Sequence, residues 1–299
     1  MLLERIYLKT FAKFNKKKFS VNEFALLHKL STSSSKVLVH RMNKNNQLLK
    51  IKHGEYVSMS PESFLKLKQL SKKNNMLYRL TVELFRNFPG LIALILYGSQ
   101  VRGGADKHSD YDVLLILPEK TEKAKIVKNE IEKKLKIKLH FTAYSKNGYQ
   151  NAILVEPYIR FWLAEGIVFD EVGITKIPVP PIAKMAYEDW QSTAETYIET
   201  ADETKKDRYY FTALEIIELI KAALRMNYDF GFVKKQLMEM VGAGLMKKMR
   251  QGKKLTKKEL LILKKSCKEE LADTKILINR LGENEADIYW KEQISGWRQ

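Results

Sequence analysis

The chain has 299 residues, of which 45% are hydrophobic and 10% aromatic, and its net charge is +18. This length and composition describe an ordinary globular protein with room for two or three domains, and they exclude a disordered or fibrous chain. The longest apolar run, LIALILY, is far shorter than the roughly 20 residues that cross a bilayer, and the N-terminus has no signal-peptide core. A single cysteine, Cys267, excludes an internal disulfide and fits a reducing compartment. We therefore expect a cytoplasmic protein without a membrane partner.

The positive charge is concentrated at one end of the chain. Residues 1–75 hold 16 Lys and Arg against 4 Asp and Glu, so two thirds of the net charge lies in one quarter of the sequence. Such a concentration is typical of nucleic-acid binding, because Lys and Arg displace counterions from the phosphate backbone. A lysine-rich solvated surface is the alternative explanation.

Residues 1–75 predict a winged helix-turn-helix domain. Residues 2–14 have apolar side chains at helical spacing, and Ser20 with Glu23 forms a capping box ahead of a second helix. The stretch STSSSKVLVHRMNKNN predicts a third helix, and two β-like runs around Gly54 predict a hairpin, the wing. In this arrangement the second helix of the turn pair enters the major groove of DNA. A small helical module that contacts protein is the alternative. The expected DNA-contacting residues are Ser33, Ser34, Ser35, Lys36, His40, Arg41 and Lys44.

Residues 76–175 alternate between helical and strand patterns, which predicts a compact α/β domain. The helix NMLYRLTVELFRNF precedes two buried strands, LIALILYG and DVLLILP. The charged amphipathic helix EKAKIVKNEIEKKLK and a third strand, IKLHFTAYS, follow. The stretch GYQNAILVEPYIRFWLAEG looks helical, and IVF is a candidate for a last short strand.

The stretch ITKIPVPPIA holds three of the seven prolines and cannot continue a helix, so it marks a boundary. Residues 184–299 look wholly helical. The segment FTALEIIELIKAALRM has the broad apolar face of a central bundle helix, and the last helix repeats apolar residues every three or four positions. We therefore expect a bundle of at least four helices.

Two aspartates at the start of the second strand, Asp110 and Asp112, are the main candidates for catalysis. Residues i and i+2 of a strand face the same side, so the two carboxylates are expected to be neighbours. A divalent cation such as Mg²⁺ relieves their repulsion, since it commonly binds one or two carboxylates together with substrate phosphates. An exposed pair at a strand edge is the alternative. In the preceding loop Gly98 lets backbone amides approach a phosphate, and Arg102 and Lys107 can neutralise polyphosphate charge.

These residues carry a resemblance to a known family. Gly98-Ser99, then Arg102-Gly103, then Ser109-Asp110-x-Asp112 resembles the signature of the DNA polymerase β-like nucleotidyltransferase superfamily, and above all its minimal prokaryotic members. The position that usually holds Ala in the family is Val101 here. The resemblance covers roughly residues 80–172, about a third of the chain.

The resemblance implies an enzyme that moves an NMP from an NTP, with ATP as the expected nucleotide, to an acceptor hydroxyl. Asp110 and Asp112 would hold Mg²⁺ on the triphosphate, and Gly98, Ser99, Arg102 and Ser109 would bind the nucleotide. The family's third carboxylate is missing, because His140 occupies the place expected for it. Three alternatives follow from this departure: a two-carboxylate site, His140 acting as a base, or a domain that binds nucleotide without catalysis.

The function expected from the whole chain is Mg²⁺-dependent nucleotidyl transfer combined with DNA binding through the winged helix. The acceptor is a protein hydroxyl, an RNA or a small molecule, and protein modification of the toxin–antitoxin kind is the favoured analogy. The helical domain is expected to shape the acceptor side of the cleft or to form a homodimer. No histidine follows His140, so the helical domain lacks the histidine that the nuclease motif of HEPN domains requires. The alternative is a DNA-binding regulator whose degenerate nucleotidyltransferase domain senses nucleotide.

Overall fold

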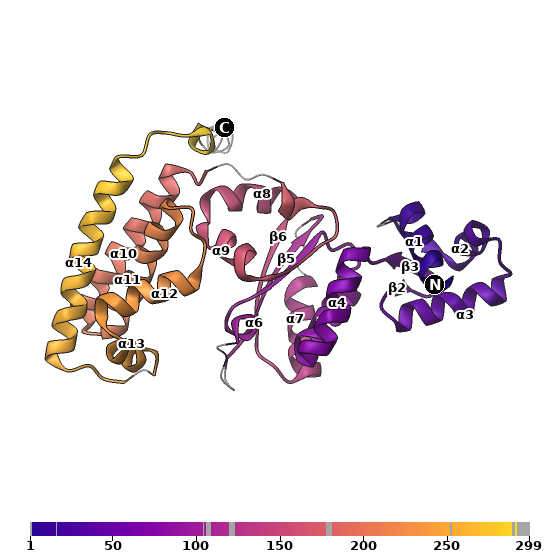
Figure 1. The fold of residues 1–299 in the computed structure, drawn as a ribbon, viewed down its shortest axis with the longest axis horizontal. Coiled ribbons are helices and arrows are strands. Elements are labelled where there is room, and N and C mark those ends of the chain that lie inside the picture. The colour runs from indigo at the N-terminus through magenta and orange to yellow at the C-terminus, as the bar shows by residue number, and fades with distance from the viewer. Residues whose placement is uncertain are drawn as a thin grey trace. The chain divides into compact units, whose positions relative to one another are not determined.

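The structure is a computed structural model that describes residues 2–15, 17–103, 105, 109–119, 123–177, 181–251, 253–288 and 291. By its contacts the chain divides into two compact units. The first comprises residues 1–149 and 166–177, and the second comprises residues 150–165 and 178–299. Figure 1 shows the two small sheets of the first unit and the helices of the second.

The N-terminal part of the first unit contains three helices and a small antiparallel sheet of strand order β1-β3-β2. The capping box is present: Glu23 N donates to Ser20 Oγ at 3.2 Å, and Ser20 N donates to Glu23 Oε2 at 2.7 Å. Gly54 turns the hairpin with a φ of +76°. The predicted helices and hairpin are therefore confirmed, whereas the winged-helix assignment stays a prediction. The elements are α1 (Leu2–Phe14), β1 (Phe19–Ser20), α2 (Val21–His28), α3 (Thr32–Lys44), β2 (Leu48–Lys52) and β3 (Glu55–Ser58).

A fourth helix, α4 (Pro61–Lys73), follows the hairpin and was not predicted from the sequence. Ser60 caps it by accepting a hydrogen bond from Ser63 N at 3.2 Å. The carboxylate of Glu171 accepts from both the backbone N–H and the hydroxyl of Ser60. This buried contact ties the start of α4 to the end of the larger sheet.

The larger sheet of the first unit has the strand order β6-β5-β4-β7. Strands β5 and β6 are parallel, and β4 is antiparallel to both β5 and β7. All the predicted strands and helices of this region are present, so the α/β expectation is confirmed. The elements are α5 (Asn75–Asn87), β4 (Ala93–Tyr97), α6 (Ser99–Arg102), β5 (Tyr111–Leu117), α7 (Lys123–Leu135), β6 (Leu139–Ser145), β7 (Ile167–Asp170) and the 3₁₀ turn Ile174–Lys176.

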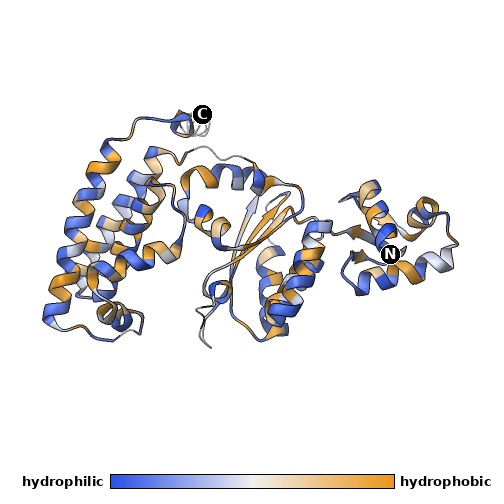
Figure 2. Cartoon of the chain, in the orientation of Figure 1, coloured by the Kyte–Doolittle hydropathy of each residue, from blue (hydrophilic) through white to orange (hydrophobic). Residues whose placement is uncertain are grey.

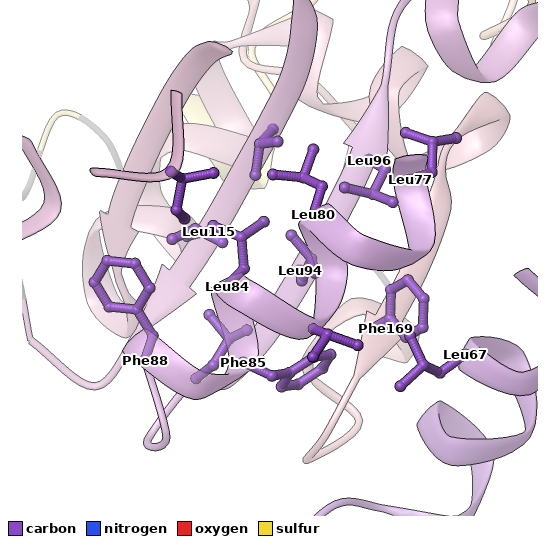
Figure 3. Packing of buried hydrophobic residues seen from close by; sticks show 14 of the residues in the cluster. Leu67, Leu77, Leu80, Leu84, Phe85, Phe88, Leu94, Leu96, Leu115 and Phe169 are labelled. Atoms are coloured by element: carbon purple, nitrogen blue, oxygen red, sulfur yellow. The ribbon is translucent and has the colours of Figure 1, made fainter. Parts of the chain in front are cut away.

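The core of this sheet lies under helix α5. Leu80 and Leu84, both fully buried, point from α5 toward the strand residues Leu94 and Leu96 (Figure 3). The ring of Phe85 packs edge-on against Phe169 at a centroid distance of 5.8 Å. Apolar strands with amphipathic helices on them, visible as orange and blue faces in Figure 2, explain why this arrangement forms.

The predicted helical stretch after β6 is two helices, α8 (Lys146–Val155) and α9 (Pro157–Glu165). The break falls at Glu156 because Pro157 has no backbone N–H to continue α8, yet its fixed φ suits the first turn of α9. Most of this stretch, residues 150–165, belongs by contact to the second unit.

The second unit is helical, as the sequence predicts. Lys221 on α11 forms ion pairs with the buried Glu218 at 2.9 Å and with Glu270 on α14 at 2.5 Å, which joins the two helices. Among the described helices, none combines the length and apolarity that a membrane crossing requires. The remaining helices are α10 (Lys184–Thr204), α11 (Asp207–Leu224), α12 (Phe230–Val241), α13 (Ala243–Arg250) and α14 (Lys257–Asn279).

Candidate active site

The site is organised by one row of residues across the larger sheet. Tyr97 at the end of β4 is in register with Asp112 on β5, and Asp112 is in register with His140 on β6. Residues in register on neighbouring strands project to the same face. The sheet therefore brings together a phenol, a carboxylate and an imidazole from three separate parts of the sequence.

Asp112 and His140 interact directly. His140 Nδ1 lies 3.1 Å from Asp112 Oδ1. The side chain of Asp112 is only 22% exposed, whereas that of His140 is 62% exposed. Burial raises the pKa of the Asp112 carboxyl, with a smaller upward contribution from the charge of Asp110, while His140 and Arg102 act in the opposite direction. A half-buried carboxylate surrounded by these groups gains from an added positive charge.

Gly98 lies against the carboxylate of Asp112. Its φ is +80° and its ψ is −167°, a region that essentially only glycine adopts. A Cβ at this position would be 1.9 Å from Asp112 Oδ2 and 2.7 Å from its Cγ. The glycine was expected to let a phosphate approach the backbone. The structure gives it a second role, because a side chain at this position would overlap the Asp112 carboxylate where it now lies.

The remaining nucleotide-binding candidates lie on the loop between β4 and β5. Ser99 is the first residue and Arg102 the last residue of the short helix α6. Gly103 follows as its C-cap, with a φ of +75°. Ser109 is held through its carbonyl, which accepts a hydrogen bond from Gln100 Nε2 at 3.0 Å. Lys107 lies outside the described residues.

Asp110 lies just before β5 and is exposed. Tyr111 N donates to Lys138 O at 2.9 Å, so pairing with the start of β6 begins immediately after Asp110. The charge of Asp110 contributes to the raised pKa of Asp112, which is consistent with the predicted proximity of the two carboxylates.

No third carboxylate joins this pair in the part of the chain that the structure describes, where no three or more His, Cys, Asp and Glu side chains are arranged so that they could hold a metal ion. Glu132 instead supports the strand beside the site, because its Oε1 accepts a hydrogen bond from Leu139 N at 2.8 Å. Two other glutamates do not take the place of the third carboxylate either: Glu130 is exposed on α7, and Glu156 separates α8 from α9.

Tyr97 and Gln100 were not singled out by the sequence. Burial raises the pKa of Tyr97 to about 12. A hydrogen bond with Thr142 acts to lower this pKa, and the negative charge of Asp112 acts to raise it. The position of Tyr97 directly before Gly98 is a signal that could have identified it. Gln100 offered no such signal, since its role depends on the folding of the loop.

The predicted nucleic-acid surface lies on α3. Ser35, Val39 and Met42 are buried and form the inner face of the helix, so the expectation that Ser35 contacts DNA is wrong. Ser34 also takes part in capping, since its backbone N–H donates to Ser31 Oγ at 3.2 Å. The other candidates, Ser33, Ser34, Lys36, His40, Arg41 and Lys44, are exposed.

Comparison with known proteins agrees with the geometry of the larger sheet. No curated protein matches the chain. A family model does match, and it covers all of the site from Tyr97 to His140. Residues 78–172 match the family described as the nucleotidyltransferase domain.

Proposed function

We propose that the protein is a metal-dependent nucleotidyltransferase that transfers an NMP from an NTP to a hydroxyl acceptor. The observation that carries the proposal is the half-buried Asp112, packed on Gly98 and hydrogen-bonded with His140, within the region that matches the nucleotidyltransferase family. In the reaction the acceptor hydroxyl releases its proton to solvent and its oxygen forms a bond to the α-phosphorus, the bond from the α-phosphorus to the bridging oxygen breaks, and pyrophosphate leaves.

The residues present fit a Mg²⁺ ion held together with substrate. Asp110 and Asp112 supply two carboxylates, and Mg²⁺ commonly takes one or two carboxylates and completes its shell with phosphate oxygens and water. When bound, the ion would neutralise the charge on the triphosphate. Ser99 and Arg102 would bind the phosphates, Arg102 through its guanidinium, and Ser109 would complete the nucleotide site. ATP is the expected nucleotide.

The test is titration of ATP, GTP, CTP and UTP into the full chain with Mg²⁺, followed by turnover of labelled NTP. We expect Mg²⁺-dependent binding that Asp110→Ala/Asp112→Ala abolishes. Glu130→Ala, which removes an exposed carboxylate on α7, is the matched control and should bind normally. Turnover that persists in the double variant would show that the site lies elsewhere.

A second candidate function is supported by His140, which stands where the family has its third carboxylate. In this reading the domain binds nucleotide without turnover, and the protein is a DNA-binding regulator. His140→Asp and His140→Ala separate the two. If wild-type protein is inactive and His140→Asp turns over NTP, the domain is a sensor. Wild-type turnover that falls in both variants supports the enzyme.

We further propose that the exposed face of α3 binds nucleic acid, DNA in the first instance. The exposed Lys36, Arg41 and Lys44 on this helix support the proposal. Lys36→Glu/Arg41→Glu should weaken DNA binding and reduce the dependence of log K on log salt by about 2, one unit for each lost phosphate contact. Lys125→Glu/Lys133→Glu makes the same charge change on the exposed side of α7 and should leave binding nearly unchanged. Binding that does not respond to salt would refute a phosphate-contacting surface.

The acceptor is proposed as a protein hydroxyl, an RNA or a small molecule, with protein modification of the toxin–antitoxin type as the guiding analogy. Incubation of the protein with labelled NTP and a cell extract, followed by separate analysis of protein, RNA and small molecules, identifies the class. Label that enters none of the three would contradict transfer to any of these acceptors.

A further inference from the structure

A cavity of about 580 Å³ opens within the first unit, between α1, α4, α5 and the turn that joins α3 to β2. This volume is within the range of about 300–1,000 Å³ that accommodates small organic ligands. None of its lining residues belongs to the candidate active site or to its loop. The cavity is therefore a separate feature of the molecule that nucleotidyl transfer does not explain.

Three aromatic side chains, Tyr7, Phe64 and Tyr78, belong to the lining. The hydroxyl of Tyr7 donates to Met59 O at 2.8 Å, which fixes the orientation of its ring. The ring of Phe64 packs edge-on against Tyr7 at a centroid distance of 5.5 Å. Tyr78 on α5 lines the cavity as well. Rings held in place before binding favour a ligand with a flat aromatic group, because little side-chain entropy is lost on binding.

Asn46 and Tyr78 are joined by a hydrogen bond in the lining. Asn46 Nδ2 donates to the hydroxyl oxygen of Tyr78 at 2.9 Å, and Asn46 Oδ1 accepts from Arg86 Nη2 at 3.5 Å. Because Tyr78 accepts in this pair, its own proton is left to donate to a ligand. A phenol that donates into an aromatic-lined cavity suits an anionic oxygen.

Two lysines give the lining a net positive charge. Lys44 and Lys68 both line the cavity and are exposed, and Glu4 is the acidic residue among the lining groups. Within the described ranges neither lysine forms an ion pair. Their ammonium groups are thus available to a ligand of negative charge.

We propose that this cavity binds a small aromatic anion of about the size of a nucleoside monophosphate. The ring would pack against Phe64 and Tyr78, which are partly exposed, and the phosphate or carboxylate would bind Lys44, Lys68 and the Tyr78 hydroxyl. Lys44 also belongs to the exposed face of α3. A bound ligand therefore competes with nucleic acid for Lys44, a consequence that rests on the nucleic-acid binding proposed above.

The test uses the full chain carrying Asp110→Ala/Asp112→Ala, in buffer with EDTA, which removes the metal-dependent binding at the candidate active site; the variants on α4 described below then locate the remaining signal. AMP, GMP, CMP, UMP and salicylate are titrated separately by calorimetry. We expect at least one of them to bind. Binding of a monophosphate identifies a phosphate ligand, and binding of salicylate alone identifies a carboxylate ligand. No heat from any of the five at millimolar concentration would overturn the proposal.

Variants on α4 locate the binding. Lys68→Glu reverses a charge on the lining and should raise Kd about tenfold, the size expected for losing one charge-assisted contact. Lys73→Glu makes the same change on the same helix at an exposed residue outside the lining, and it should leave Kd within twofold. Both positions are exposed, so neither change threatens folding. Equal effects of the two variants would show non-specific attraction to a basic protein, and the proposal would fail.

Discussion

Replacing Gly98 by alanine tests two reasons why glycine is needed at this site: the backbone conformation of the residue and the space beside Asp112. Gly98 has a backbone conformation that costs a non-glycine residue about 1–3 kcal/mol. Its Cβ would also meet Asp112 Oδ2 at 1.9 Å, a distance that no pair of unbonded atoms tolerates. Because the register of the strands holds the backbone of Asp112 between Tyr97 and His140, the overlap is relieved by moving the Asp112 carboxylate away from the position that it holds in the site.

Gly103→Ala is the matched control. Gly103 also has a positive φ, +75°, but nothing lies within 4 Å of the position of its Cβ. The control therefore pays only the backbone cost of about 1 kcal/mol, or about 2–4 °C in Tm. Gly98→Ala should lose more stability than the control, because strain and steric overlap both act. It should also lose nucleotide binding, because the overlap displaces Asp112.

The assay is thermal unfolding of the three proteins, followed by titration of the NTP that the wild type binds. We expect Gly98→Ala to abolish Mg²⁺-dependent binding and Gly103→Ala to retain it. A Gly98→Ala protein with the stability of the control and wild-type affinity would refute the reasoning, since Asp112 would then not need the space that Gly98 leaves.

Three further outcomes follow from the buried and capped groups. Leu80→Ala empties a fully buried position under the larger sheet and should cost about 2–5 kcal/mol of unfolding free energy, measured by urea denaturation against the exposed Leu65→Ala as control. Cys267 is fully buried and burial raises its pKa to about 12, so iodoacetamide at pH 8 should label it only after unfolding, as mass spectrometry can check; rapid labelling of native protein would contradict its burial. The ion pair with Lys248, followed by the N-cap contact, lowers the pKa of Glu259 from 4.5 to about 2. A lowered folded-state pKa means that this contribution is present above pH 4.5 and is lost as the pH falls toward 2, so the stability gap between wild type and Glu259→Gln should close over that window; a gap that stays constant would rule out this linkage.

Local sequence patterns determined most of the secondary structure. The capping box of Ser20 and Glu23, the glycine turn at Gly54 and the apolar strands on either side of the Gly98 loop each depend on residues close together in the chain. Helix α4 was missed although Ser60 and Pro61 give it a clear N-terminal signal. The break before Pro157 could likewise have been read from the sequence.

The spacing of the motif predicted the position of the candidate site residues along one strand, but not which residues of other strands lie beside them. It placed Asp112 on β5 and identified His140 as the residue that stands where a carboxylate was expected. The tertiary structure decided what surrounds Asp112, because the order β6-β5-β4-β7 and the register of each strand pair set Tyr97 and His140 beside it. The close approach of Gly98 has the same origin. Register depends on how strands far apart in the sequence pair, and no local pattern contains that information. Local sequence patterns thus identified candidate residues, and the pairing of the strands brings Tyr97, Asp112 and His140 together.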